Sequence, residues 1–277
     1  MRIATVEAGG EVGARSAEAR RRMSERRGEH VFTAGWRQVL MVHLEVDPER
    51  LARAVPFELD LWDGRAFVTL VAFTMRGMRP ALDGWLGFVG ALLFRPIATH
   101  RFLNVRTYVR DGGDVGIHFL AEWLSSGLAV RLGPPTFGLP YRHGRLTYRQ
   151  DVGLGALEGD VVDGRTGGRL RYRGVTEPGA DFAPCEAGSR EAWWMERYTA
   201  YTERAGIRRT FRVWHPPWRQ VPTEVEVSKR SLLVQHWPWM REAPIVGGNY
   251  SPGFDGVWMG RPRRFLGAMP QASGVVR

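Results

Sequence analysis

The chain has 277 residues, of which 44% are hydrophobic and 11% aromatic, so it holds ample material for a packed core. Its net charge is +10, but the basic residues are spread among acids without a long basic run. We therefore expect a solvated basic surface and no nucleic-acid partner, and the single cysteine, Cys185, excludes an internal disulfide and a thiolate metal cluster.

The N-terminal region is poor in large apolar side chains. The composition of residues 1–32 predicts a disordered extension, and residues 1–30 contain no apolar stretch of the kind found in secretory signals. The longest apolar run covers residues 85–94, far fewer than the roughly 20 residues that span a bilayer. We expect a cytoplasmic protein with no membrane partner.

Most of the chain after residue 33 shows short strand-like segments bounded by Gly and Asp turns. In the clearest of them, Leu103 and Val105 alternate with Asn104 and Arg106, as the two faces of a strand require. Strands are predicted over residues 36–46, 65–75, 102–110, 115–122, 139–150, 156–163, 168–175, 207–215 and 222–228.

These strands predict a mainly β (α+β) fold, a closed antiparallel β-barrel with a few peripheral helices. No repeat or linker-like break follows residue 33, so residues 33–277 are expected to form one domain. Ser189 is the expected N-cap of a helix over residues 189–202, whose aromatic side chains would pack on the barrel. Residues 238–277 are rich in Trp, Pro and Gly and predict a tail wrapped over the surface.

Standard catalytic and cofactor motifs are missing from the sequence. It has no glycine-rich dinucleotide or phosphate loop and no Gly-x-Ser-x-Gly nucleophile elbow. The histidines form no pair at metal-binding spacing, and Cys185 lies in a Pro- and Gly-containing loop as an incidental thiol. The sequence therefore predicts no cofactor and no metal, and it identifies no catalytic residue.

Polar side chains share faces on two successive strands. Arg106 and Tyr108 lie on one face of their strand, and His118 and Glu122, four residues apart, are expected to share a face of the next. If these faces point into a barrel, Arg106 needs an acid or a bound anion, because a buried unpaired charge is costly. The alternative is that the face meets solvent.

The order and spacing of six segments carry a family resemblance. The segments are His43 in the first strand, VPFELDLWDGRAFVTLVAF, FLNVRTYVRDGGDVGIHF, LAVRLGPPTFGLPYRHGRL, MERYTAY and His215-Pro-Pro-Trp218. Together they resemble the YqjF-like family, the domain of unknown function 2071, over about residues 36–220. The chain departs from the family pattern at Leu44, where tryptophan is common, and after Phe119, where Leu-Ala-Glu-Trp follows.

The YqjF-like family is similar in fold to the acetoacetate decarboxylases, so the resemblance implies a β-barrel around a buried pocket. In those enzymes a Gly-x-Pro-Lys-Lys segment supplies a Schiff-base lysine with a lowered pKa. The matching residues here are 138–142, GLPYR, with Tyr141 at the position of that lysine, and tyrosine cannot form an imine. Because Lys229 is the only lysine and lies outside this segment, the resemblance implies a pocket without Schiff-base chemistry.

These observations predict a small-molecule pocket protein, which includes the hypothesis of an enzyme acting on a carbonyl or carboxylate compound. Two alternatives stay open. One is a non-catalytic ligand-binding or sensor module on the same fold, and the other is an interaction protein that uses its C-terminal tail. The sequence does not indicate the oligomeric state. The predicted ligand is a small organic anion, and the predicted ligand-binding residues are Arg106, Tyr108, His118, Tyr141 and His143.

Overall fold

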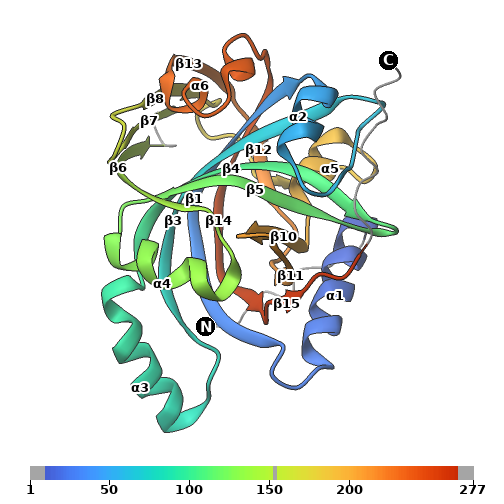
Figure 1. The fold of residues 1–277 in the computed structure, drawn as a ribbon, viewed down its shortest axis with the longest axis vertical. Helices are drawn as coiled ribbons and strands as arrows, with labels where there is room; N and C mark the ends of the chain where they lie inside the picture. Colours follow the sequence, from blue (N-terminus) through green and yellow to red (C-terminus); the bar gives the residue numbers. More distant parts are fainter. Residues whose placement is uncertain (1–9, 152–154, 268–277) are drawn as a thin grey trace.

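The computed structural model describes residues 10–151 and 155–267, and most of these belong to one curved 15-stranded sheet with helices at its periphery (Figure 1). The helices are α1 (Glu11–Ser24), α2 (Pro48–Ala54), α3 (Gly84–Phe94), α4 (Gly127–Phe137), α5 (Arg190–Met195) and α6 (Ser231–Val234), with 3-10 turns η1 (Arg95–Ile97) and η3 (Pro238–Met240). The strands are β1 (His30–Val46), β2 (Glu58–Leu59), β3 (Ala66–Pro80), β4 (His100–Asp111), β5 (Asp114–Leu124), β6 (Tyr141–Asp151), β7 (Ala156–Asp163), β8 (Arg169–Val175), β9 (Ala183–Pro184), β10 (Thr199–Arg204), β11 (Ile207–Trp214), β12 (Arg219–Pro222), β13 (Glu224–Arg230), β14 (Ile245–Gly260) and β15 (Arg263–Arg264). The prediction of a mainly β fold is confirmed.

The hydrogen-bonded strand pairs form a circuit. From β5 it runs through β10, β11, β14, β1, β3 and β4, and β4 pairs again with β5. The pairs β5–β10 and β5–β6 are parallel, so the predicted antiparallel pairing does not hold on these two sides of β5. The parallel pairing of β6 follows from its connection to β5. Helix α4 joins the end of β5 to the start of β6, and the start of β6 lies beside the end of β5.

Strand alternation divides the apolar side chains between two clusters. On β4, Leu103 and Val105 belong to a cluster that also contains Leu146 of β6 and Leu157 of β7. Phe102 and other side chains of the opposite face belong to a second cluster, which contains residues of every strand of the circuit. The polar residues between them on β4 therefore point toward the second cluster.

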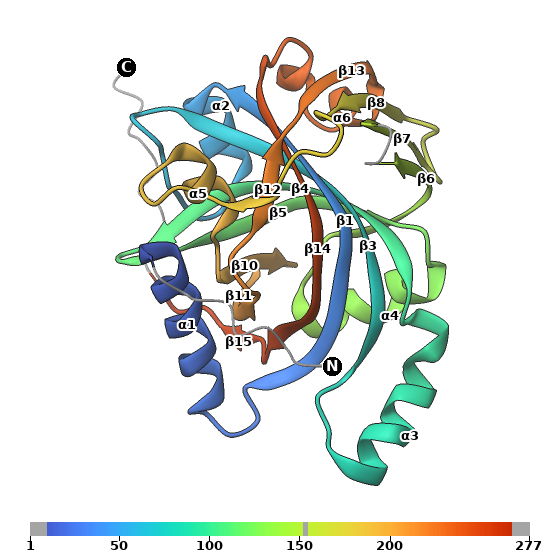
Figure 2. The same ribbon diagram turned by 180° about the vertical axis from the view of Figure 1, so that it is seen from behind.

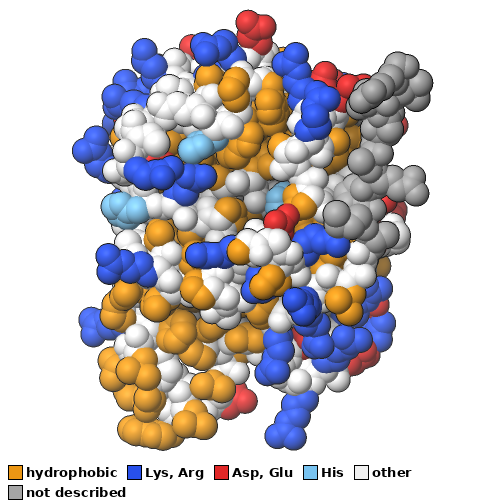
Figure 3. All heavy atoms as spheres, viewed as in Figure 1, with side chains coloured by type: hydrophobic (Ala, Val, Ile, Leu, Met, Phe, Trp, Pro, Cys, Tyr) orange, Lys and Arg blue, Asp and Glu red, His pale blue; other side chains and the backbone are white. Residues whose placement is uncertain are grey.

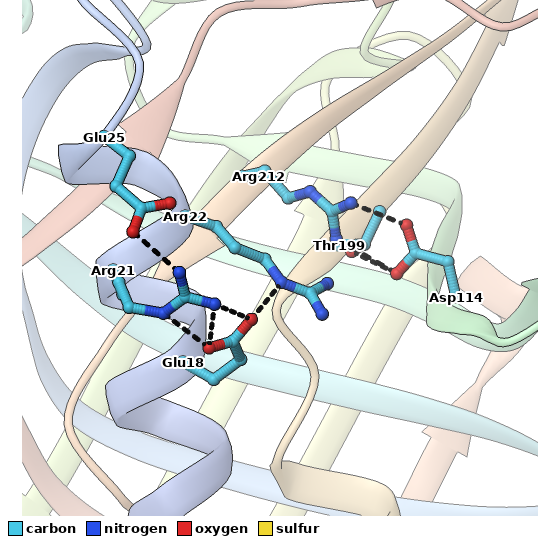
Figure 4. Close-up of polar contacts among 7 residues, drawn as sticks. All are labelled: Glu18, Arg21, Arg22, Glu25, Asp114, Thr199 and Arg212. Carbon is cyan, nitrogen blue, oxygen red and sulfur yellow. Dashed lines mark hydrogen bonds and ion pairs between the residues drawn. The ribbon is translucent and has the colours of Figure 1, made fainter.

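The N-terminal segment forms α1 where the composition predicted disorder. Ser16 Oγ donates to the carbonyl oxygen of His215 at 2.8 Å, and Met23 is buried. Arg21 joins Glu18 and Glu25 along the helix, which supports its exposed face (Figure 4). A few well-placed contacts thus compensate for the low apolar content, and the expectation is corrected over residues 10–32. Residues 1–9 lie outside the described residues.

The helix predicted over residues 189–202 is shorter than expected, because α5 ends within it and β10 follows. Just after α5, Arg197 Nη1 lies 2.6 Å from Asp60 Oδ2, and this buried ion pair holds the chain in a non-helical course. The predicted length is therefore wrong. The expected burial of the aromatic side chains is confirmed for Trp194 and Tyr198.

Strand β10 is also fixed to its neighbours by polar side chains. Arg212 of β11 forms an ion pair with Asp114 of β5 at 2.9 Å, and its Nη1 donates to Thr199 Oγ1 at 2.6 Å (Figure 4). Thr199 in turn donates to Asp114 at 3.0 Å. The strands β5, β10 and β11 are therefore joined at one point.

The predicted C-terminal tail contains one of the longest strands of the sheet. β14 pairs with β1 along most of its length and with β11 and β12 as well (Figure 2). The Gly and Pro residues of β14 allow bulges in its pairing with β1. Gly253 adopts φ +85°, and a Cβ there would lie 1.9 Å from the carbonyl oxygen of Trp36. The tail prediction is wrong for β14, and residues 268–277 lie outside the described residues.

Candidate functional site

A cavity of about 390 Å³ lies inside the strand circuit, and residues from every strand of the circuit line it. Most of the lining is apolar or aromatic, and this volume and composition are typical of small-molecule sites. The polar lining residues include His100, Asn104, Arg106, Glu122, Tyr141, Arg197, Thr199 and His215.

Arg106 reaches the cavity from β4 without a charged partner. Its side chain is buried next to the Tyr108 hydroxyl, and Nη2 donates two long hydrogen bonds, to the Trp194 carbonyl at 3.4 Å and to Met41 Sδ at 3.6 Å. Its Nε has no hydrogen-bond partner, and no described acid forms an ion pair with it. Burial lowers the pKa of this guanidinium, yet an arginine remains charged at neutral pH. The cavity therefore contains an uncompensated positive charge.

The second cavity-lining arginine, Arg197, differs from Arg106 because it has an acidic partner. Its guanidinium pairs with Asp60, and its Nε donates to the Trp193 carbonyl at 2.6 Å. It also lies over the Trp193 ring, with 4.4 Å between the guanidinium carbon and the ring centroid. The charge of Arg197 is thus balanced within the protein, and only Arg106 of these two arginines offers an unmatched charge.

Glu122 reaches the cavity because β5 contains a bulge. Val105 on β4 pairs with Ala121 on β5, and the next residue, Arg106, pairs with Phe119. Leu120 therefore has no register partner on β4. The extra residue reverses the alternation, so that Phe119 and Glu122 both line the cavity. The expectation that His118 and Glu122 share a face is therefore wrong.

The carboxyl of Glu122 is buried without an ion pair to any described residue. Its Oε2 has no hydrogen-bond partner, and burial raises its pKa well above the usual carboxyl range. Asn104, the residue opposite it on β4, also has a buried oxygen, Oδ1, without a partner. Two strands thus present unsatisfied polar atoms to one apolar cavity, and such atoms are rare in folded proteins unless a ligand or water meets them.

Tyr141 joins Glu122 across a parallel strand pair. The two residues are register partners on β6 and β5, and burial together with the nearby Glu122 raises the pKa of the Tyr141 hydroxyl well above its usual value. Helix α4 packs closely behind the ring, since a Cβ on Gly133 would lie 2.3 Å from it. The left-handed Gly138, φ +71°, ends α4 and directs the chain into this strand. The close packing at Gly133 and the left-handed conformation of Gly138 therefore help to set the position of Tyr141.

The other predicted site residues lie outside the cavity lining. Tyr108 is buried behind it, with its hydroxyl 2.6 Å from Thr69 Oγ1 and its ring 4.5 Å from that of Trp193. His118 faces away, and its Nδ1 lies 2.9 Å from the carbonyl oxygen of Tyr201. His143 is exposed. Of the five predicted residues, only Arg106 and Tyr141 therefore line the cavity, and Tyr108 lies behind it next to Arg106.

Further polar lining residues were not predicted from the sequence, among them Asn104, His100 and His215. Strand alternation places Asn104 on the same face as Arg106, so this signal was present but not used. Burial lowers the pKa of His100 and of His215 to about 4, so both imidazoles are neutral at physiological pH. The positions of His100 and His215 depend on the pairing of strands in the circuit, so no local sequence pattern predicts them as lining residues.

His43, which marks the resemblance described above, is a buried structural residue behind Arg106. Its ring stacks on Trp194 with 3.9 Å between centroids, and its nitrogens lie 2.9 Å from Thr69 Oγ1 and 3.0 Å from Asn249 Oδ1. Burial lowers its pKa to about 3. Because Trp194 is also the residue whose carbonyl accepts from Arg106, this stack helps to fix the position of the guanidinium.

The described residues contain no group of three or more His, Cys, Asp or Glu side chains that could hold a metal ion. Lys229 is exposed on β13 and is not among the residues that line the cavity. Within the described ranges, every helix is too short or too polar to cross a lipid bilayer.

Solved structures with low sequence identity share this fold. An acetoacetate decarboxylase-like enzyme from Sphingomonas wittichii RW1 superposes with a TM-score of 0.60 at 16% identity, covering 87% of this chain and 95% of that one. The enduracididine biosynthesis enzyme MppR, in its complex with pyruvate, gives a TM-score of 0.57 at 12% identity over 84% of this chain and 90% of its own. These similarities establish an acetoacetate decarboxylase-like fold.

The sequence comparisons identify closer relatives. The uncharacterized protein YqjF of Bacillus subtilis (strain 168) is 26% identical over 215 residues, which cover 73% of this chain and 79% of YqjF. The family model DUF2071, described as an uncharacterized conserved protein, matches residues 33–255. These residues include every lining residue discussed above, and the chain belongs to the DUF2071 family, with YqjF as a relative and an acetoacetate decarboxylase-like fold.

Proposed function

We propose that this protein binds a small organic anion with an apolar body, and that Arg106 binds its carboxylate. The observation that carries the proposal is the buried guanidinium of Arg106, which lines the cavity and has no acidic partner among the described residues. A guanidinium presents paired N–H donors that match a carboxylate, and a bound anion would offset the cost of burying the charge.

The apolar lining supports an amphipathic ligand over a highly polar one. Phe73, Phe119 and Phe211 line the cavity together with Trp36 and Met41. Apolar carbon atoms of a ligand in contact with these side chains are removed from water, which favours binding in proportion to the buried area. We also propose that the strand circuit is a closed barrel and that the described part of residues 33–277 is one domain, since the closure would keep water from this lining.

A second proposal is that the protein is an enzyme in which Glu122 donates or accepts a proton. Its support is the combination of a raised pKa, a partner-free Oε2 and a place in the cavity beside Tyr141. A neutral carboxyl in an apolar site can donate a proton to a developing oxyanion of a carbonyl substrate. In this proposal Arg106 holds the substrate carboxylate and Glu122 acts on the carbonyl.

The proposed reaction does not proceed through a lysine imine. Tyr141 stands at the sequence position matched to the Schiff-base lysine, and the only lysine, Lys229, lies on the exposed surface of β13. The pyruvate complex of MppR is that of a protein with the same fold and 12% identity, and it supports a carboxylate as the ligand class without specifying the ligand.

The test of the proposal is the thermal stability of the full chain with matched ligands. Octanoate, its α-keto analogue and octanol share one apolar body and differ in the head group. We expect both acids to raise the melting temperature in a saturable manner, because binding to the folded state stabilises it, and octanol to have a much smaller effect. Equal effects of octanoate and octanol would contradict the role of Arg106.

A further inference from the structure

Helix α3 carries an apolar surface that no part of the described protein covers. Trp85 is 74% exposed and Leu93 is 73% exposed, and Leu86, Phe88 and Leu92 are exposed as well. Hydrophobic side chains gather over this projecting helix at the lower left of the molecule (Figure 3). Contiguous exposed apolar patches of this kind mark an interaction surface on folded proteins.

The composition of α3 limits the kind of partner. The helix has the sequence GWLGFVGALLF and contains no charged residue, so every one of its faces is apolar. At 11 residues it is too short to cross a bilayer, and its exposure shows that it is not a core helix. A short, wholly apolar, exposed segment with a tryptophan near its start is typical of one that enters a membrane interface.

The charges around α3 favour an anionic surface. Arg76 and Arg79 precede the helix on β3, Arg95 follows it directly, and all three are exposed. None of them forms an ion pair with a described residue, and Asp83 is the one acid between Arg79 and the helix. A second copy of this chain packed symmetrically on α3 would bring these arginines near their own counterparts, which is unfavourable, whereas anionic lipid head groups would attract them.

The patch also lies at the cavity entrance. Phe94, the last residue of α3, lines the cavity, as does Leu132 of α4, which is 54% exposed. Leu128, on the preceding turn of α4, is exposed too. The apolar lining of the cavity therefore continues outward onto the apolar surface of the two helices.

We propose that α3 inserts into the surface of an anionic phospholipid bilayer, with Trp85, Leu86, Phe88 and Leu93 in the acyl-chain boundary and Arg79 and Arg95 at the head groups. The expectation of no membrane partner rested on the length needed to cross a bilayer, and a helix that lies in the interface does not need that length. Docking in this way places the cavity entrance against the lipid. The proposal is independent of the proposed cavity ligand.

The experiment is flotation of the full chain with vesicles of phosphatidylcholine alone and of phosphatidylcholine with about a third phosphatidylglycerol. We expect binding to the anionic vesicles that weakens as salt is added. Leu93→Asp is expected to lower the vesicle affinity by at least about tenfold, because it places a charge where an apolar group enters the lipid. The paired change Arg79→Gln and Arg95→Gln is expected to weaken binding to anionic vesicles and to leave the weak binding to neutral vesicles unchanged.

The matched control is Leu266→Asp, since Leu266 is 88% exposed but lies after β15, away from α3. It is expected to bind vesicles like the unmodified chain, and equal melting temperatures verify that all variants are folded. The proposal is overturned if the unmodified chain does not float with anionic vesicles or if Leu93→Asp floats equally well. It is also overturned if light scattering shows a dimer that Leu93→Asp converts to a monomer while neither form binds vesicles. No cavity ligand is used, so these outcomes leave the proposed function untouched.

Discussion

Arg106 and Glu122 lie on the paired strands β4 and β5, and both line the cavity, yet no ion pair joins them. Burial alone accounts for the raised pKa of Glu122, with no contribution from the arginine, so the two groups do not neutralise each other. The cavity thus combines a fixed positive charge with a carboxyl that stays protonated. This arrangement suits an anion bound at Arg106 and a hydrogen-bond or proton donor at Glu122.

The first prediction concerns the stability cost of Arg106. Replacing an unpaired buried charge by an apolar side chain of similar length removes a desolvation penalty. We expect Arg106→Met to raise the free energy of unfolding by about 1 kcal/mol or more, measured by urea denaturation at neutral pH without ligand. A clear loss of stability would instead mean that the bond to the Trp194 carbonyl holds α5 in place.

The second prediction concerns the pH dependence of anion binding. Below its raised pKa Glu122 is neutral, and as the pH increases through that value it becomes negative and repels an anion in the same cavity. We expect calorimetry to show that the affinity for octanoate falls at alkaline pH in the unmodified chain and stays level in Glu122→Gln. The control is Glu224→Gln, which changes an exposed carboxylate on β13. An alkaline loss that persists in Glu122→Gln would assign it to another group.

The third prediction concerns Glu196, whose carboxylate accepts from the Trp218 backbone N–H at 2.8 Å and from the Tyr198 hydroxyl. Burial raises its pKa to about 7 from an ordinary value of 4.5. The folded state therefore binds the proton more tightly than the unfolded state, so this group stabilises the fold below about pH 4.5 and the contribution is lost as the pH rises toward 7.

We expect Glu196→Gln to remove this pH dependence. The difference in unfolding free energy between the variant and the unmodified chain should change by on the order of 2 kcal/mol between pH 4.5 and pH 7. Buried histidines such as His43 titrate in both proteins and cancel in that difference. Parallel stability curves for the two proteins would show that the pKa of Glu196 is the same in the folded and unfolded states, and would contradict this account.

The fourth prediction separates this site from lysine imine chemistry. Incubation with pyruvate and borohydride is expected to leave no adduct on Lys229, because its amine is exposed and does not reach the cavity. Intact-mass measurement of the unmodified chain and of Lys229→Arg checks this. A stoichiometric adduct that is present in the first and absent in the second would restore the Schiff-base mechanism.

The sequence was sufficient for the fold class because strand alternation is a local property. Leu103 and Val105 on one face and Asn104 and Arg106 on the other are visible in the letters alone, and the structure separates them as expected. The start of α5 was recognised from its Ser189 cap, whose hydroxyl accepts from the Ala192 backbone N–H at 3.1 Å.

The errors arose where distant contacts override local pattern. The bulge at Leu120 is specified by pairing with β4 and reverses the face of His118 relative to Glu122. Helix α1 depends on contacts with His215, and β14 depends on pairing with β1, and neither partner is near in sequence. His143 was expected at the site with Tyr141, but His143 is exposed, and of these two residues only Tyr141 lines the cavity.

The central claim is that Arg106 binds the carboxylate of the ligand, and calorimetric titration of octanoate into Arg106→Met tests it most directly. Arg142→Met is the matched control, since Arg142 lies over the Trp123 ring, 5.8 Å from its centroid, and does not line the cavity. We predict that octanoate binds Arg142→Met like the unmodified chain and binds Arg106→Met at least about tenfold more weakly. Equal affinity of octanoate for Arg106→Met and the unmodified chain would contradict the claim.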